Sequence, residues 1–351
     1  MNKHICMKGG SKLTYSLLLF FFIWTNSCQA QALGLKKDTI QFCVMSYNVE
    51  NLFDCRHDTL KSDYEFLPQA TRHWTFSKYR KKLDNIARVI LSLGGWNPPA
   101  LVGLCEVEND SVLHALTHYS LLRNTGYRYI ITHSNDQRGI DVGLLYQRKW
   151  FKPIHIEALS VKKPAGVHRD TRDVLHVSGC LVNLDTLDVI ICHFPSRRGG
   201  ARHSEPYRLS AAQTVRRCVD SLYSVRQKPQ VIIMGDFNDY PENLSIQNIL
   251  GNNPTLHHLL AKKTSQKHNG TYKFKGEWGL LDHLIVSPSL TQPHATFFTP
   301  PDSGHIFNPP FLLTTDKTYG GEQPFRTYWG MRYLGGFSDH LPIYASFRLI
   351  Y

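Results

Sequence analysis

The sequence predicts a layered α/β fold, in which helices cover the faces of β-sheets. Two observations support this prediction. Short apolar runs typical of buried strands recur along most of the 351 residues. Between them lie two longer stretches whose apolar residues have the spacing of an amphipathic helix. A strongly mixed strand order would make this architecture a sandwich rather than a doubly wound sheet.

The expected strands are apolar runs that end at a polar residue or a turn signal. They cover residues 40–47, 100–105, 140–146, 175–184, 187–192, 231–234, 281–287 and 343–349. Asp185-Thr186 separates two of these runs, which suggests a hairpin.

The two expected helices cover residues 78–93 and 206–224. In the first, apolar residues recur at helical spacing from Leu83 to Leu91, and Gly94-Gly95 is typical of a left-handed C-terminal cap. In the second, apolar residues recur in the same way from Leu209 onward.

One long segment, residues 299–336, fits neither pattern. It is rich in Pro, Gly and aromatic residues and has little periodicity. A connection of this length is usually functional or disordered.

The N-terminus is typical of a secretory signal peptide covering residues 1–32. Three lysines precede the apolar run 17–24, which is too short to span a bilayer comfortably, and Ala30-Gln31-Ala32 matches an A-x-A cleavage site. In a second interpretation, cleavage occurs before Cys28, which then carries a lipid anchor; the preceding residues 25–27 lack the usual apolar residue. We therefore expect an exported protein, in the periplasm, outside the cell or on the outer membrane, with no transmembrane span in the mature chain.

The chain is basic, with 40 Lys and Arg against 28 Asp and Glu and a formal net charge of +12. A basic surface concentrates phosphate-bearing partners, although it also serves solubility alone. Six cysteines follow residue 32, and none has the spacing of a zinc site.

Four polar residues each stand where an apolar strand ends: Asn48, Glu106, His193 and Asp236. Strand ends are where sheet scaffolds present side chains to a common cleft. Each residue alone is explained better by the start of a turn. Because all four follow a buried run, coincidence is a poor explanation for the set.

The residue types in and near this set suit phosphoester hydrolysis. Asn48, Glu106 and Asp339 offer oxygen ligands of the kind that Mg²⁺ prefers. Asp236 could orient or deprotonate a water molecule, and Asn238 could hydrogen-bond a phosphoryl oxygen.

Basic residues complete the expected chemistry. His193 and His340 could act as acid and base groups or as phosphate donors. Arg197 and Arg198 add fixed positive charge with bidentate geometry for phosphate. The alternative for the two arginines is a solvated turn.

The motifs occur in an order that resembles the endonuclease/exonuclease/phosphatase superfamily. That superfamily includes DNase I-like nucleases, abasic-site endonucleases, neutral sphingomyelinases and inositol polyphosphate 5-phosphatases. The resemblance extends from about residue 40 to residue 351. It is carried by Tyr47-Asn48-Val49-Glu50-Asn51, Cys105-Glu106-Val107-Glu108-Asn109, Cys192-His193-Phe194, Gly235-Asp236-Phe237-Asn238, Leu281-Asp282-His283 and Ser338-Asp339-His340-Leu341-Pro342.

The resemblance implies a four-layer α/β-sandwich, with two packed mixed β-sheets flanked by helices, as a single catalytic domain over residues 38–351. It implies a Mg²⁺ cofactor, with Mn²⁺ or Ca²⁺ as alternatives. The residues that it places at the metal are Asn48, Glu106 and Asp339.

Carried over in the same way, Asp236 would activate the nucleophilic water and Asn238 would stabilise the transition state. His340 would be the acid/base histidine, oriented by Asp282. His193 stands where DNase I-like enzymes carry a histidine and abasic-site endonucleases a tyrosine, which favours the DNase I-like side.

Two further segments resemble an exported bacterial subgroup: 138–142, which contains Arg138, and 324–328, which contains Arg326. We expect both arginines to bind substrate phosphate together with Arg197 and Arg198. The aromatic residues Tyr319, Phe325, Tyr328 and Trp329 of the segment 299–336 could stack on bases, face lipid or pack.

The leading hypothesis is a nuclease-like phosphodiesterase acting as a monomer on DNA or RNA. A sphingomyelinase-like, sugar-phosphate or inositol-phosphate phosphoesterase is the alternative of the same class. A catalytically silent surface binding module is the alternative of another class.

Overall fold

The computed structural model describes residues 38–94, 97–164, 169–262 and 270–351. They form one compact unit, Asp38–Tyr351. The predicted signal segment 1–32, with Cys28, lies outside the described residues. Within the described ranges, no helix has the length and apolarity to cross a bilayer.

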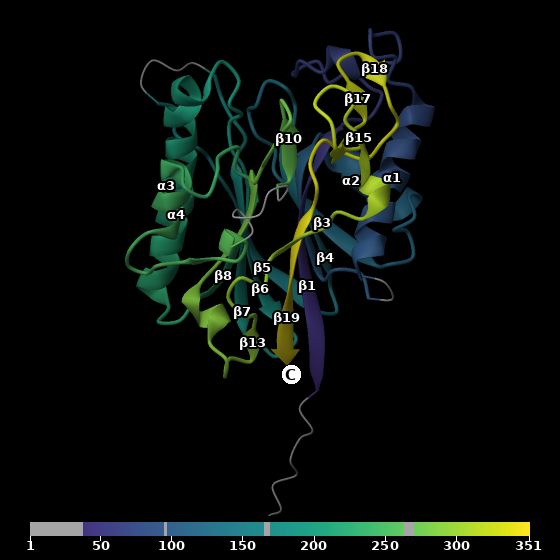
Figure 1. Cartoon of the computed structure of the whole chain (residues 1–351). Helices are drawn as coiled ribbons and strands as arrows, with labels where there is room; N and C mark the ends of the chain where they lie inside the picture. Colours follow the sequence, from purple (N-terminus) through teal and green to yellow (C-terminus); the bar gives the residue numbers. More distant parts are fainter. Residues whose placement is uncertain (1–37, 95–96, 165–168, 263–269) are drawn as a thin grey trace, which may run out of the picture. The chain divides into compact units, whose positions relative to one another are not determined.

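One mixed sheet is built around the first and last long strands of the unit (Figure 1). Its strands β1 and β2 are parallel, and its other pairs are antiparallel. The strand order is β13 (Phe297–Phe298), β19 (Ile343–Ile350), β1 (Thr39–Leu52), β2 (Leu101–Val107), β4 (Asp141–Gln147) and β3 (Tyr127–Ile131), with β14 (His305–Ile306) also paired to β19.

The second mixed sheet follows the same scheme, with one parallel pair, β7 and β8, among antiparallel neighbours. Its order is β5 (Phe151–Leu159), β6 (Val174–Leu181), β7 (Thr186–His193), β8 (Gln230–Asp236), β12 (Asp282–Val286) and β9 (His257–His258). A parallel pair needs a crossover connection, usually a helix. Helix α1 (Phe76–Gly94) joins β1 to β2, and helix α3 (Ala201–Val225) joins β7 to β8.

The two sheets pack face to face, and helices cover their outer faces. Helix α1 and helix α2 (Asp110–Tyr119) lie against the first sheet, while α3 and α4 (Leu244–Leu250) lie against the second (Figure 1). A third apolar cluster fills the space between the sheets. The prediction of a four-layer α/β-sandwich is therefore confirmed.

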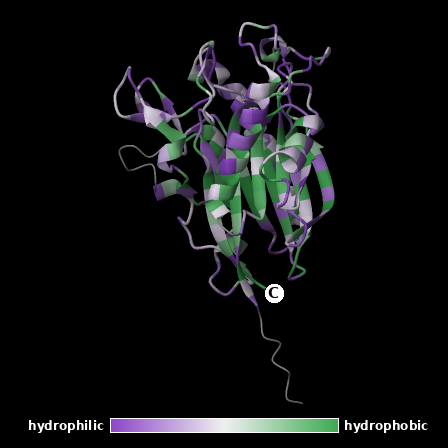
Figure 2. Ribbon diagram, turned by 90° about the vertical axis from the view of Figure 1, so that its right-hand side faces the viewer, coloured by the Kyte–Doolittle hydropathy of each residue, from purple (hydrophilic) through white to green (hydrophobic). Residues whose placement is uncertain are grey.

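Strand β1 illustrates how alternation builds these layers. Phe42 and Val44 point into the core between the sheets, whereas Met45 and Tyr47 point toward α1. Successive side chains of a strand point to opposite faces, so a strand covered on both faces must be apolar at nearly every position. Figure 2 shows the resulting concentration of hydrophobic residues on the strands.

Several predicted boundaries were wrong. The second helix begins at Ala201 rather than at Pro206, which lies inside the helix. The strand predicted to reach residue 184 ends at Leu181, because residues 182–185 form the hairpin loop: Leu184 N–H donates to the carbonyl of Leu181, and Leu181 N–H to that of Asp185. Of the predicted cap of α1, Gly95 lies outside the described residues.

The segment 299–336 contains short elements instead of one irregular connection. Besides β14, they are η4 (Pro310–Leu312) and the two hairpins β15 (Leu313–Thr315) with β16 (Glu322–Pro324) and β17 (Tyr328–Trp329) with β18 (Arg332–Tyr333). Two- and three-residue strands are too short to produce a readable period. A further hairpin, β10 (Tyr272–Phe274) with β11 (Glu277–Gly279), precedes β12.

Gly235, the penultimate residue of β8, permits the close approach of β7. Its φ is +146°, and a Cβ there would lie 1.9 Å from the carbonyl oxygen of Cys192. Backbone cannot yield as a side chain does, so we expect Gly235→Ala to lower the free energy of unfolding by more than about 3 kcal/mol.

Gly126→Ala is the matched control for this prediction. Gly126 also has a positive φ, +74°, but a Cβ there would meet nothing within 4 Å. The control isolates the conformational cost, which we expect to be about 1 kcal/mol. Urea denaturation of both variants checks the difference, and equal losses would contradict the steric explanation.

Candidate active site

Four of the predicted site residues continue the inward-facing row of their strands. Asn48 follows Phe42 and Val44 on β1, and Asp236 follows Ile232 and Met234 on β8, in rows that take every second position of the strand. His193 on β7 and Asp282 on β12 extend the inward rows of those strands in the same way. Both pair in register with Asp236. The four side chains therefore emerge together at one end of the inter-sheet core.

Glu106 reaches the same end through a bulge in β2. Its φ is +65°, and the pairing of β2 with β4 shifts register between Cys105 and Val107. A bulge re-aims a side chain that regular alternation would send elsewhere. The side chain is held by the backbone N–H of Asn51, which donates to Glu106 Oε2 at 2.9 Å.

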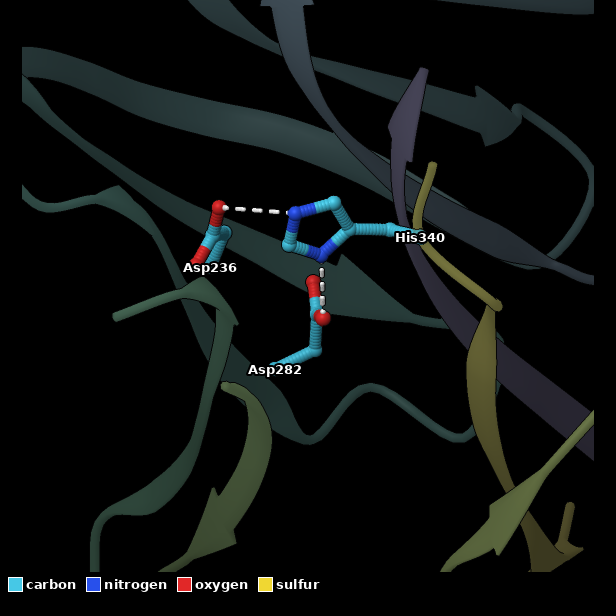
Figure 3. A group of neighbouring side chains, drawn as sticks. All are labelled: Asp236, Asp282 and His340. Atoms are coloured by element: carbon cyan, nitrogen blue, oxygen red, sulfur yellow. Dashed lines mark hydrogen bonds and ion pairs between the residues drawn. The ribbon is translucent and has the colours of Figure 1, made fainter. Parts of the chain in front are cut away.

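His340 lies between two carboxylates (Figure 3). Its Nδ1 is 2.7 Å from Asp282 Oδ2, and its Nε2 is 3.7 Å from Asp236 Oδ2. Burial opposes the charged ring, but the Asp282 and Asp236 carboxylates outweigh it and raise the pKa of His340 well above its ordinary value. The imidazole is thus oriented by Asp282 and held in its protonated form.

Both carboxylate oxygens of Asp236 accept hydrogen bonds from other residues of the site. Its Oδ2 accepts from Asn48 Nδ2 at 2.9 Å, and its Oδ1 accepts from the backbone N–H of Asn238 at 2.9 Å. Burial raises the pKa of Asp236 to about 7, against the stabilising charge of His340. A carboxylate with a pKa in this range is suited to accept a proton near neutral pH.

His193 is 4% exposed and lies close to two acids. Its Nε2 is 3.9 Å from Glu106 Oε1 and 3.8 Å from Asp236 Oδ2. Burial, together with the charges of Arg172 and Arg138, lowers the pKa of His193 well below its ordinary value. The ring is therefore neutral.

The donor chemistry of Asn48, Glu106 and Asp339 fits a hard divalent cation. Two of the three are carboxylates, and Glu106 and Asp339 remain 13% and 20% exposed. Nearby Glu50 adds another acid: burial first, then repulsion by Asp339, raises its pKa. A cation at this position would relieve the repulsion among these acids.

Asp236, Asp282 and His340 are also close enough to one another to hold a cation. The hydrogen bond between His340 Nδ1 and Asp282 Oδ2 already uses one ligand atom of each. This grouping is therefore better suited to proton transfer than to metal binding.

Two residues of the site were missed by the sequence analysis as individual contributors, Glu50 and Lys82. Glu50 accepts from the backbone N–H of Thr327 at 2.6 Å and pairs with Arg326 at 3.3 Å. Lys82 is 1% exposed and donates to Thr327 Oγ1 and to the carbonyl of Phe337, each at 2.5 Å. The sequence contains one indication of this role, because Lys82 lies on the apolar face of α1, where a lysine is unusual.

The four expected phosphate-binding arginines are differently placed. Arg326 is held between Glu50 and Asp339, with 2.9 Å to Asp339 Oδ2. Arg138 donates to Asn51 Oδ1 at 2.7 Å and lies 3.8 Å from Glu106.

The other two arginines lie on the loop that precedes α3. Arg197 stacks on the ring of Tyr240, with 4.6 Å to its centroid. Arg198 is exposed. Both differ from Arg138 and Arg326, which contact the acidic groups around Glu106 and Asp339.

The aromatic residues of segment 299–336 divide into two groups. Phe325 and Tyr328 pack into the cluster between α1 and the first sheet, so packing explains them. Tyr319 and Trp329 are 54% and 49% exposed. Only this second group is free to meet a ligand.

The family model for the Endonuclease/Exonuclease/phosphatase family matches residues 43–348. The chain belongs to this family of phosphoester hydrolases. Among curated proteins, none matches the sequence.

Solved structures show the same fold at low sequence identity. An endonuclease/exonuclease/phosphatase family protein from Bacteroides thetaiotaomicron is 15% identical, with a TM-score of 0.56, over 89% of this chain and 99% of that one. A mannosyl-6-phosphatase from the same organism is 15% identical, with a TM-score of 0.56, over 87% and 99%. The human Nocturnin catalytic domain, with bound sulfate, is 15% identical, with a TM-score of 0.53, over 89% and 97%.

We expect Lys82→Met to destabilise the protein by about 3–5 kcal/mol, because it leaves the buried acid Glu50 without one of its neutralising charges. The same change should loosen the loop that Lys82 ties down at Thr327 and Phe337. Chemical denaturation measures the first effect, and amide hydrogen exchange at Thr327 the second.

Lys81→Met is the matched control, because Lys81 is the exposed neighbour on the same helix. A surface substitution of this kind changes stability by less than about 0.5 kcal/mol. A Lys82→Met protein as stable as this control would contradict the structural role of the buried ammonium.

Proposed function

We propose that this protein is an exported, Mg²⁺-dependent phosphodiesterase, with nucleic acid as the first candidate substrate. The observation that carries the proposal is the placement of His340 between Asp282 and Asp236 beside the oxygen ligands Asn48 and Glu106. Mn²⁺ or Ca²⁺ could replace Mg²⁺. Export rests on the sequence of residues 1–32 alone.

In this proposal, Asp236 accepts a proton from the attacking water. His340, oriented by Asp282, donates a hydrogen bond or a proton to the reacting phosphoester. Both groups lie at the same end of the inter-sheet core, within 3.7 Å of each other. General acid and base groups arranged in this way typically contribute 10²–10⁴-fold each to the rate.

In the same proposal, neutral His193 and the amide of Asn238 hydrogen-bond phosphoryl oxygens. Asn238 Nδ2 donates to the carbonyl of Phe194 at 3.0 Å, which fixes the amide beside Asp236. A bound divalent cation would be held by Asn48, Glu106 and Asp339, and would neutralise charge on the phosphoryl group.

A sugar-phosphate or inositol-phosphate substrate is the second candidate. The shared fold with a mannosyl-6-phosphatase supports it. So does a cavity of about 910 Å³ beside the site, a size that suits a small molecule.

The first test is metal dependence and substrate choice with the purified protein. We expect Mg²⁺ to support hydrolysis within a panel of plasmid DNA, RNA, sphingomyelin, inositol phosphates and bis-p-nitrophenyl phosphate, and excess chelator to abolish it. Asp236→Ala and His340→Ala should each lower kcat by about 10³-fold or more. Full activity in chelator would overturn the metal requirement, and no turnover of any compound would favour a silent binding module.

A second test separates the orienting role of Asp282 from the chemistry itself. We expect Asp282→Asn to lower kcat by about 10²–10⁴-fold, because the amide removes the charge that holds His340 protonated and oriented. Asp220→Asn, on the exposed face of α3, is the control and should leave kcat unchanged. Steady-state kinetics on the best substrate of the panel gives the answer, and wild-type activity for Asp282→Asn would refute the proposed dyad.

A further inference from the structure

A cavity of about 910 Å³ lies directly beside the candidate active site. On one side it is lined by Asn51 and Arg138, which contact the Glu106 carboxylate. On another it is lined by Arg172, whose Nη2 donates to the carbonyl of Phe194 at 2.7 Å. That carbonyl also accepts from Asn238, so cavity and site share a wall.

The cavity has unbalanced positive charge. Its five arginines are Arg72, Arg138, Arg169, Arg172 and Arg198. Three acids also line it: Glu65 pairs with Arg72, Asp136 pairs with Arg172, and Asp170 pairs with a lysine outside the lining, Lys163. Within the described ranges, Arg169 and Arg198 form no salt bridge.

Two residues that line the cavity also have buried donors that the protein leaves unused. Arg172 is 6% exposed, and its Nε–H has no hydrogen-bond partner among the described residues. The hydroxyl of its neighbour Thr171 is also buried and unpaired there. Buried donors without a partner cost stability, and their positive potential beside the cavity favours an anion there.

The start of α3 adds a third source of positive potential. Gly199, His203 and Ser204 line the cavity, and the first turn of this 25-residue helix contains no acid. The first N–H groups of a helix have no partner inside it and attract anions.

We propose that this cavity binds a second phosphate group of the substrate, joined by its organic part to the phosphoester that is cleaved. This inference rests on the proposed function, because it names a specificity subsite of the same active site. Arg169 and Arg198, which line the cavity and are exposed, are the contacts, and buried Arg172 adds positive charge to the wall behind them. Phosphate fits because it offers several acceptor oxygens and two negative charges to donors that converge from different segments.

The same chemistry occurs in two sources, the neighbouring phosphate of a nucleic-acid strand and the second phosphate of a small bisphosphorylated compound. Tyr64 and Phe66 give the cavity apolar lining that either organic part could contact.

A matched pair of substrates tests the subsite. The p-nitrophenyl ester of thymidine 5′-phosphate and the same ester with an added 3′-phosphate differ only in the second phosphate. We expect kcat/KM with Mg²⁺ to be at least about 10-fold higher for the bisphosphate, mainly through KM. In Arg169→Ala and in the Arg169→Ala, Arg198→Ala double variant, the ratio should fall toward one. Lys228→Ala, which removes an exposed charge at the opposite end of β8, should keep the wild-type ratio.

A wild-type ratio near one, or a ratio that both arginine variants preserve, overturns the subsite. Failure of the proposed function is distinguishable, because then neither ester is hydrolysed. In that event calorimetric binding of thymidine 3′,5′-bisphosphate decides: tight binding that Arg169→Ala weakens supports the subsite, and no binding overturns it.

Competition distinguishes the two sources. Inhibition by thymidine 3′,5′-bisphosphate but not by oligothymidylate assigns the subsite to small bisphosphates. Inhibition by both assigns it to nucleic acid as well. Inhibition by neither contradicts the proposal.

Discussion

Two hydrogen bonds join the two sheets at one end of their shared apolar core, and the site depends on them. Asn48 of β1 donates to Asp236 of β8, and His340, just before β19, pairs with Asp282 of β12. Asn48 and Asp236 belong to different sheets, while Asp282 belongs to the second sheet and His340 to the segment that leads into β19 of the first. Polar groups at the edge of an apolar core must find partners, and here they find them across the gap. The packing of the two sheets against each other therefore also fixes the geometry of the site.

Charge neutralisation is the second requirement of this arrangement. Glu50, Glu106, Asp236, Asp282 and Asp339 gather in a small volume, largely out of water. The protein opposes this negative charge with Lys82, Arg138, Arg326 and protonated His340. Burial lowers the pKa of Lys82 to about 8. The charged form of this lysine therefore carries a desolvation cost, which the nearby acids offset. A divalent cation would offset part of the remaining negative charge.

Backbone strain is concentrated in the same place. Of the eight non-glycine residues with positive φ in the described ranges, four are Glu50, Asn51, Glu106 and Asn238. Such conformations cost about 1–3 kcal/mol each and persist only where the surroundings enforce them. Here they re-aim carboxylate and amide groups at the ends of regular strands.

The sequence by itself determined the layered class, the main strands and the candidate residues of the site. It could do so because burial on both faces leaves continuous apolar runs, and because polar residues that end those runs stand out in the chain. The short helices α2 and α4, the strand β5 and the hairpins of segment 299–336 gave no comparable period. Tertiary packing, rather than local propensity, stabilises such short elements.

Only the tertiary structure decided which of these residues meet. The distance from Asp282 to His340 depends on how two sheets pack, and no local pattern encodes it. The same holds for Lys82, 245 positions before Thr327, and for the cavity whose five arginines come from four separate segments. The spacing of apolar residues along the sequence indicates which face of one strand or helix a residue occupies. Contacts between layers are set by the packing of whole elements, so they appear only when the sandwich is assembled.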